Sequence, residues 1–509
     1  MEQDEQEDPA LTAKKAALLA LLDASSSVNG HGDFQEAYIN PSVSEGSGKS
    51  ETSVQNCMLQ SVEQMEQENG IPSTVCTSSP QTNCHKNSES ISVDNESPNI
   101  APRPKVDGHK NSKLTCVDSE SPNAPKEIFA PLLALNFEKE FQSSEDNFTK
   151  GCKWSPDGSC LLVGSNDKML RIFNLPSRVS CGDIQDESWF FEESSKHINP
   201  ALTMKEGECI YDYTWYPAMH SSDAQSCCFA VTCRGCPVHL WDAWHGKLIC
   251  SYLPYDHLDQ LVAAYSIAFN LDGSELFCGF NKAIRIFQVS RPGREFVKID
   301  ARDQPGIISC MAFNPVLPSV FVAGSYLGNL GLYSTDRNAL FCRIDGCPGG
   351  MTQIKFSSDG IKLFSGARMN NKILCWDLRN PGKLLWSFRR EVNTNQRISF
   401  DLEPHSNNFL ISGTTNGSVL KWNLQDLPLP DGEDPEMIKT SSKFVAHKDC
   451  CNGVSLNPHF PVLATSSGQR HFPEPQSCSS SDSSSEDDGP LFLHRKNKYE
   501  NSVKLWWLG

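Results

Sequence analysis

The 509-residue sequence predicts an all-β protein whose main part is a seven-bladed β-propeller. From about residue 128 onward, short segments with the apolar alternation of strands are separated by turn residues. These segments align into seven copies of one repeat, and an aromatic residue ends the third strand of each copy. The strand pattern, the repeat and its recurring aromatic residue together favour a ring of similar sheets.

Each copy of the repeat has the same order of strands and turns. The clearest copies, at 152–175, 265–289 and 352–378, consist of a strand, an Asp-Gly turn, a second strand, a polar turn and a third strand. The successive third-strand aromatic residues are 68, 46, 46, 43, 46 and 84 positions apart, so four spacings agree with one period and two contain insertions. These residues are Phe173, Trp241, Phe287, Tyr333, Trp376, Trp422 and Trp506.

The period also indicates the kind of propeller and the way its ring closes. A repeat of roughly 40 to 45 residues with four strands is typical of WD-repeat propellers. The Trp-Asp dipeptide occurs at Trp241-Asp242 and Trp376-Asp377. The seventh copy has no fourth strand, whereas the segment 128–141 belongs to no copy. We expect 128–141 to close the ring, because this pairing removes two exposed sheet edges.

Residues 1–127 have the composition of a disordered tail. Residues 1–126 contain 19 acidic and 9 basic residues, which contribute −10 to the net charge of −17. They are rich in Ser, Asn, Gln and Glu, and they have too few apolar residues to offset the entropy of folding. One stretch places Leu11, Leu18 and Leu22 on one helical stripe, either as a docking helix or as a transient one.

Two insertions interrupt the propeller region, residues 128–509. Residues 176–207 lengthen the link from the first to the second blade, and we expect the aromatic residues 189–191 to pack on the ring. Residues 469–500 form an acidic, Ser-rich loop between the second and third strands of the seventh blade. This loop is either a solvated spacer or a substrate of an acid-directed kinase.

The cysteines and the apolar segments indicate a reducing compartment. There are 21 cysteines, but the apolar run 16–22 follows acidic residues instead of the basic ones of a secretory signal. No stretch approaches the roughly 18 to 20 apolar residues of a transmembrane helix. Cys233 and Cys236 have CxxC spacing but lack a second pair of ligands, so we expect no metal and no cofactor.

Motifs that would indicate an enzyme are absent or incomplete. Gly48-Lys49-Ser50 matches the end of a phosphate loop, but Val43 stands where the first glycine is needed. No GxSxG or HExxH motif occurs, and the histidines of the repeats show no ligand spacing. We therefore predict no catalytic residues and no small-molecule substrate.

The topology of four-stranded antiparallel blades predicts which loops share a face. Turns between second and third strands lie on one face with the links between blades, and the remaining turns lie on the other. The first face collects basic residues with aromatic residues between them, which suits single-stranded RNA because bases stack on rings and phosphates pair with cations. The candidate RNA-binding residues are Lys168, Arg234, Lys282, Arg302, Arg368, Lys372, Arg389, Arg390, Arg397, Phe280 and Tyr326.

Four stretches give the sequence a specific resemblance to a known family. They are GCKWSPDGSCLLVGSNDKMLRIFNLP at 151–176, ISCMAFNP at 308–315, SGQRHFPEP at 467–475 and the terminal VKLWWLG. Over residues 128–509 the chain resembles the telomerase Cajal body protein family. None of the family's RNA contacts is carried over to this chain, so the candidate residues rest on topology alone.

The resemblance implies a non-enzymatic protein of the nucleus, located in Cajal bodies and at telomeres. It implies binding to the Cajal-body localisation element of box H/ACA small Cajal body RNAs and telomerase RNA. The implied protein partners are dyskerin-containing H/ACA particles, telomerase reverse transcriptase and other Cajal body proteins such as coilin.

Two other functions fit the same fold. Trp376, Asp377 and Arg379 form a WDxR box on the opposite face, which is typical of substrate receptors of cullin-4 ubiquitin ligases. A scaffold that binds no RNA is the third hypothesis, and no sequence feature excludes it.

Overall fold

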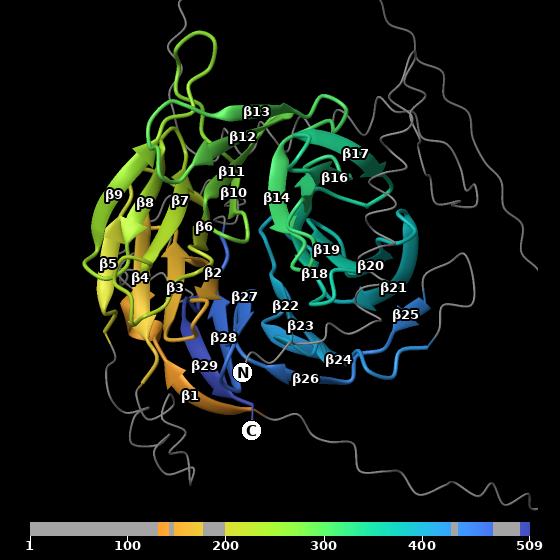
Figure 1. Cartoon of the computed structure of the whole chain (residues 1–509). Helices are drawn as coiled ribbons and strands as arrows, with labels where there is room; N and C mark the ends of the chain where they lie inside the picture. Colours follow the sequence, from red (N-terminus) through yellow and green to blue (C-terminus); the bar gives the residue numbers. More distant parts are fainter. Residues whose placement is uncertain (1–130, 142–146, 177–198, 429–435, 472–498, 509) are drawn as a thin grey trace, which may run out of the picture. The chain divides into compact units, whose positions relative to one another are not determined.

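Seven β-sheets form a ring in the computed structural model (Figure 1). The structure describes residues 131–141, 147–176, 199–428, 436–471 and 499–508. The sheets follow one another along the chain as blades, and the first strands of neighbouring blades contact each other around the centre of the ring. The predicted seven-bladed propeller is therefore confirmed.

In blades 1 to 6 the strands run in chain order from the centre outward, whereas the outer strand of blade 7 comes from the N-terminal side of the propeller. Blade 1 consists of β2 (Thr149–Trp154), β3 (Cys160–Ser165), β4 (Met169–Asn174) and β5 (Leu202–Lys205). Blade 2 consists of β6 (Ile210–Trp215), β7 (Cys228–Cys233), β8 (Val238–Asp242) and β9 (Lys247–Tyr252). Blade 3 consists of β10 (Ser266–Phe269), β11 (Glu275–Phe280), β12 (Ala283–Gln288) and β13 (Val297–Asp300).

Blades 4 to 7 complete the ring. Blade 4 consists of β14 (Ile308–Phe313), β15 (Val320–Ser325), β16 (Leu330–Ser334) and β17 (Ala339–Ile344), and blade 5 of β18 (Met351–Phe356), β19 (Lys362–Ala367), β20 (Lys372–Asp377), β21 (Lys383–Arg389) and β25 (Glu436–Ile438). Blade 6 consists of β22 (Phe400–Leu402), β23 (Phe409–Gly413), β24 (Ser418–Asn423) and β26 (Ser442–Val445). Blade 7 consists of β27 (Cys451–Leu456), β28 (Val462–Ser467), β29 (Val503–Trp507) and β1 (Leu132–Asn136). A short 3-10 helix, η1 (Glu138–Phe141), follows β1.

The second strands show why the repeat is apolar at its centre. Strands β3, β7, β15 and β28 are buried at every residue. Neighbouring blades cover both faces of such a strand, so it cannot alternate between core and solvent. All the predicted third-strand aromatic residues except the half-buried Trp241 are buried as well. The core therefore consists of apolar layers shared by adjacent blades.

The ring closes through a pair of strands from the two ends of the propeller. β1 runs antiparallel to β29, with Leu132 opposite Trp507 and Asn136 opposite Lys504. The side chain of Leu135 is buried in a cluster that joins blades 7 and 1. The segment that the sequence assigns to closure thus supplies the outer strand of blade 7.

In two places, an asparagine of one blade forms a hydrogen bond with the Asp-Gly turn of the next blade around the ring. Asn457 of blade 7 donates a 2.8 Å hydrogen bond from Nδ2 to the carbonyl of Gly158 in blade 1, and Asn314 of blade 4 does the same with Gly360 in blade 5. Both glycines have positive φ, and a Cβ at either would lie within 2.5 Å of the asparagine Oδ1. Glycine is therefore required for the turn and for the contact between blades.

Two features differ from the repeat pattern. β5 lies inside residues 176–207 and is the outer strand of blade 1, so this insertion falls between the third and fourth strands and not between blades. The prediction was wrong because β5 is short and mostly exposed, which leaves no apolar run to recognise. β25 was not predicted, and it adds a parallel strand to the outer edge of blade 5.

Several predictions concern residues outside the described ones. They include the disordered tail at 1–127, the packing of residues 189–191 and most of the loop at 469–500. Within the described residues, no helix is long and apolar enough to cross a membrane.

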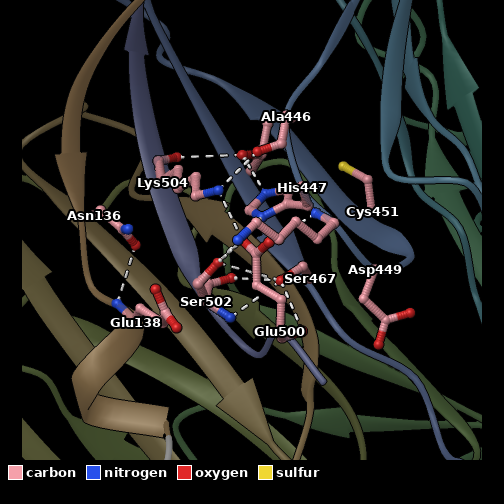
Figure 2. Close-up of polar contacts among 12 residues, drawn as sticks. Asn136, Glu138, Ala446, His447, Asp449, Cys451, Ser467, Glu500, Ser502 and Lys504 are labelled. Atoms are coloured by element: carbon pink, nitrogen blue, oxygen red, sulfur yellow. Dashed lines mark hydrogen bonds and ion pairs between the residues drawn. The ribbon is translucent and has the colours of Figure 1, made fainter. Parts of the chain in front are cut away.

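A buried hydrogen-bond network supports blade 7 beside the second insertion (Figure 2). Trp506 Nε1 donates to Thr465 Oγ1 at 2.8 Å, and Thr465 Oγ1 lies 2.8 Å from His447 Nε2. His447 Nδ1 lies 3.0 Å from Glu500 Oε1, which also forms a 2.7 Å ion pair with Lys504 Nζ. Burial lowers the pKa of His447. Burial would raise the pKa of Glu500, but hydrogen bonds from His447 and Lys504 outweigh it and hold this pKa far below its usual range.

We predict that closure depends on the buried face of β1. Leu135→Ala should lower the free energy of unfolding by about 2–5 kcal/mol, because it leaves a cavity between blades 7 and 1. Leu132→Ala is the matched control on the same strand, and it should change this free energy by less than about 0.5 kcal/mol because Leu132 is 40% exposed. Urea unfolding of the full chain measures both values. Equal effects of the two substitutions would contradict the closure by β1.

We also predict that the His447 network makes stability depend on pH. As pH falls below about 6.5, unfolded His447 takes up a proton that the folded protein resists, so stability is lost with falling pH. The lowered pKa of Glu500 adds a second loss at more acidic pH. In urea unfolding at several pH values, His447→Asn should remove the first loss, and substitution of the exposed His257 by Asn should not. An unchanged pH profile in His447→Asn would show that the network does not control this titration.

Candidate nucleic-acid interface

We call the side of the ring formed by second-to-third-strand turns and by links between blades the link face, and the other side the hairpin face. The structure places every candidate RNA-binding residue in an element of the link face. Their side chains differ in exposure, however, and they do not form one uniform patch. Some of these cations are available at the surface, and others form contacts inside the fold.

Blade 5 presents two neighbouring cations at its link-face end. Lys372 begins β20 and Arg389 ends β21, and the two residues lie directly opposite each other in the antiparallel pair. Both are exposed, and no carboxylate of the described residues forms an ion pair with either. This end of blade 5 therefore carries two positive charges that the described part of the fold does not neutralise.

An aromatic residue and an arginine lie at the adjacent boundary of blades 4 and 5. Tyr326 is half-buried in the turn between β15 and β16, and the Arg368 guanidinium lies 4.7 Å from the centre of its ring. Arg368 also donates a hydrogen bond to the carbonyl of Asn395 in the link to blade 6. Burial lowers the pKa of Arg368. Cation and ring are thus held together in a fixed arrangement beside the two exposed cations of blade 5.

The remaining surface cations are spread over blades 1 to 3 and the link that follows blade 3. Lys168 forms a 3.2 Å ion pair with Glu208, and Arg302 pairs with Asp300, its Nε lying 2.6 Å from Oδ2. Lys282 is exposed. Arg234, in the turn between β7 and β8, is half-buried. These residues lie on the link face, but they belong to other blades than the Tyr326 and Arg368 pair.

Two candidate residues are buried, so the expectation that they face solvent was wrong. Phe280 is 3% exposed and packs against Arg285, whose guanidinium lies 4.5 Å from its ring centre. Arg390 is also 3% exposed, and its Nη1 donates to the Ile398 carbonyl and to Ser412 Oγ. Burial lowers the pKa of Arg390 to about 9. Phe280 ends β11 and Arg390 directly follows β21, and both side chains turn inward, a direction that loop assignment alone cannot predict.

Arg397 is a brace across the ring. It precedes β22 of blade 6, yet its Nη2 donates to the carbonyls of Ser309 in blade 4 and Tyr265 before blade 3. Its Nη1 lies 3.4 Å from Asp212 Oδ1 in blade 2, and Lys153 Nζ of blade 1 lies 3.3 Å from the same atom. Burial would raise the pKa of Asp212, but these two cations hold it below the usual value. The charge of Arg397 is therefore used inside the ring.

Sequence reasoning missed a second group of link-face residues at the start of the inner strands. Tyr211 of blade 2 and Tyr265 before blade 3 are half-buried, and their rings stack with centres 5.6 Å apart and planes 14° apart. Lys150 holds the same position in blade 1, four residues before the large residue that ends the strand. Comparing this one position in consecutive repeats would have found all three residues.

Comparisons with known proteins agree with this fold. The family model described as WD domain, G-beta repeat, matches residues 137–174. Telomerase Cajal body protein 1 of Mesocricetus auratus is 46% identical over 376 residues, which are 73% of this chain and 67% of that protein. The Homo sapiens protein of the same name is also 46% identical over 376 residues, 73% of this chain and 65% of that protein. The Drosophila melanogaster homolog is 37% identical over 378 residues, 71% and 66% of the two chains.

The chain belongs to the telomerase Cajal body protein 1 family. It spans about two thirds of the length of these relatives. The family resemblance deduced from the sequence motifs is thus confirmed.

In this member of the telomerase Cajal body protein 1 family, the WDxR box has a local structural role. Trp376 is buried and donates from Nε1 to Ser365 Oγ at 2.8 Å. Asp377 is buried as well, and Arg379 Nη2 lies 2.8 Å from its Oδ2. Arg379 is half-exposed on the hairpin face, and its guanidinium is held by the carboxylate of its own turn.

Blade 7 contributes an open, polar cavity to the link face. Its volume is about 420 Å³. Its lining residues are Asn136, Glu138, Lys448, Tyr499, Glu500 and Lys504. Figure 2 shows Glu500 and Lys504 within the His447 network, where their charges already pair. No group of three or more metal-ligating side chains suited to an ion occurs among the described residues.

We predict that Arg397 stabilises the ring more than it binds any ligand. Arg397→Met should lower the free energy of unfolding by about 1–3 kcal/mol, because Asp212 loses a charged partner and two carbonyls lose a donor. Lys282→Met is a matched control on the same face and should stay within about 0.5 kcal/mol of the parent. Urea unfolding measures both. An Arg397→Met protein as stable as Lys282→Met would contradict the brace.

Proposed function

We propose that this protein is a non-catalytic RNA-binding scaffold. It binds the Cajal-body localisation element of box H/ACA small Cajal body RNAs and telomerase RNA, and it directs these particles and telomerase to Cajal bodies and telomeres. The family relatives carry telomerase and the Cajal body in their name. The protein partners in this proposal are dyskerin-containing H/ACA particles, telomerase reverse transcriptase and coilin, all in the nucleus.

The observation that carries the proposal is the cation pair Lys372 and Arg389. Like charges directly opposite each other weaken an antiparallel strand pair, and an anionic ligand that neutralises them would relieve this cost. Two RNA phosphates, one beside each cation, would satisfy both charges. Tyr326 and Arg368 lie at the neighbouring blade boundary and offer a ring and a guanidinium plane for base stacking.

A catalytic function has less support. The arrangement that most resembles a catalytic relay is His447 with Ser502 and Glu500, in which His447 Nδ1 lies 3.1 Å from Ser502 Oγ. All three residues are buried, so a substrate cannot reach the hydroxyl. The ligase-receptor hypothesis rests on the single WDxR box of Trp376, Asp377 and Arg379. The burial of Trp376 and the pairing of Arg379 with Asp377 give these residues a role within their own blade.

We predict that reversing the charges of the pair weakens RNA binding without unfolding the ring. The variant is Lys372→Glu with Arg389→Glu, titrated with an RNA loop that carries the localisation element at several salt concentrations. The slope of log Kd against log salt should flatten by about 1.4, since each phosphate contact in single-stranded RNA contributes roughly 0.7. Tyr326→Leu should instead cost about 1–3 kcal/mol of binding free energy with little change of slope.

The matched control is Lys247→Glu with Lys383→Glu, two exposed cations at the hairpin-face ends of outer strands. This control changes the net charge by the same amount, so it should bind RNA far better than the link-face variant. A loop of scrambled sequence tests specificity. If both charge reversals bind equally well while their thermal unfolding stays cooperative, the link face of blade 5 is not the RNA site.

A further inference from the structure

A lysine and a cysteine from neighbouring blades touch on the link face. Lys150 lies in β2 of blade 1. Cys209 lies in the link that runs from β5 of blade 1 to β6 of blade 2. Lys150 Nζ is 2.8 Å from Cys209 Sγ and 3.2 Å from the Ile210 carbonyl oxygen. Both residues are half-buried, so solvent and small oxidants reach them. The contact joins a nucleophilic sulfur to an amine in a fixed position.

The other thiols of the propeller are less suited to reaction. Burial raises the pKa of Cys152, Cys228 and Cys310 to about 12, which keeps these thiols protonated. Since the thiolate is the reactive form, such cysteines act as inert core residues. Cys236 is half-buried as well, but burial also raises its pKa. Cys209 differs in that its sulfur contacts a cation at the surface.

We propose that Lys150 and Cys209 form an oxidant-sensitive modification site at which a peroxide joins the two side chains as a sulfenamide. The Cys209 sulfur attacks one peroxide oxygen, the O–O bond breaks, and the products are a sulfenic acid and one water. The Lys150 amine, having given its ammonium proton to solvent, then attacks the sulfenic sulfur. A sulfur–nitrogen bond forms and the hydroxyl leaves as a second water. One peroxide is reduced, and the pair loses two hydrogens.

The cross-link would regulate the RNA face. A sulfenamide nitrogen is uncharged, so the reaction removes the cation of Lys150 from the link face. Lys150 holds the position of Tyr211 and Tyr265 in the neighbouring blade, and its Nζ contacts the carbonyl of Ile210, the residue before Tyr211. An RNA that extends along the link face from the blade 5 cations to Lys150 would bind more weakly after oxidation, a consequence that rests on the proposed RNA-binding function. Reduction of the sulfur–nitrogen bond by a thiol would restore the cation.

The chemical half is tested on the full chain without RNA. The protein is treated with hydrogen peroxide, remaining thiols are alkylated, and the digest is analysed by mass spectrometry with and without a thiol reductant. We expect a pair of peptides linked through Lys150 and Cys209, lighter by two hydrogens and separated by the reductant. Lys150→Arg keeps the charge but lacks a deprotonatable amine, so it should abolish the link. Cys236→Ser should retain it. A sulfenic acid at Cys209 with no link, or a disulfide between Cys209 and Cys236, would overturn the proposal.

The regulatory half is tested by RNA titration before and after peroxide treatment. The parent protein should lose affinity and flatten its salt slope by about 0.7, and reductant should restore both. Cys209→Ser should bind like the untreated parent in both conditions. A link that forms without changing RNA affinity overturns the regulation. The absence of any link overturns the site itself and leaves the proposed RNA function untouched.

Discussion

Each four-stranded sheet of this protein has two apolar faces, and only neighbouring sheets can cover both. This constraint makes the ring the unit of folding, because a blade with one missing neighbour would expose its fully buried second strand. The pairing of β1 with β29 satisfies the constraint for the last gap. It also brings the two ends of the propeller region together, so the described strands form a closed series of sheets.

Because of the same constraint, charged residues near the centre of the ring and those at its surface have different roles. Charges near the centre of the ring are paired across blades, as in the contacts of Asp212 with Lys153 and Arg397. Charges at the outer part of the link face of blade 5 lie beyond these contacts and remain available. A rigid core therefore positions loop residues without using all of their charges, which is the usual way in which a scaffold carries a binding surface.

Much of the fold could be predicted because the same pattern of strand and turn residues recurs in each repeat. The third-strand aromatic residues and the Asp-Gly turns recur at fixed positions, and the number of blades followed from them. Strands β5 and β25 were not predicted because they lie beside insertions and have few buried residues.

At the candidate site, topology predicted that the candidate residues lie on the link face, and the structure places them in elements of that face. It could not show that Phe280 and Arg390 turn into the core, since strand-end side chains choose between core and solvent by packing. It also missed Tyr211 and Tyr265, whose stacking depends on the spacing of two neighbouring blades.

In the proposed function, RNA lies on the link face at the boundary of blades 4 and 5. The most direct measurement is photo-crosslinking of an RNA loop carrying the localisation element to the full chain, followed by identification of the linked peptides. Links to the peptide that contains Tyr326, and to the peptides between Arg368 and Arg389, are the expected result. Specific links confined to turns of the hairpin face, such as the one that contains Arg379, would contradict this location of the RNA.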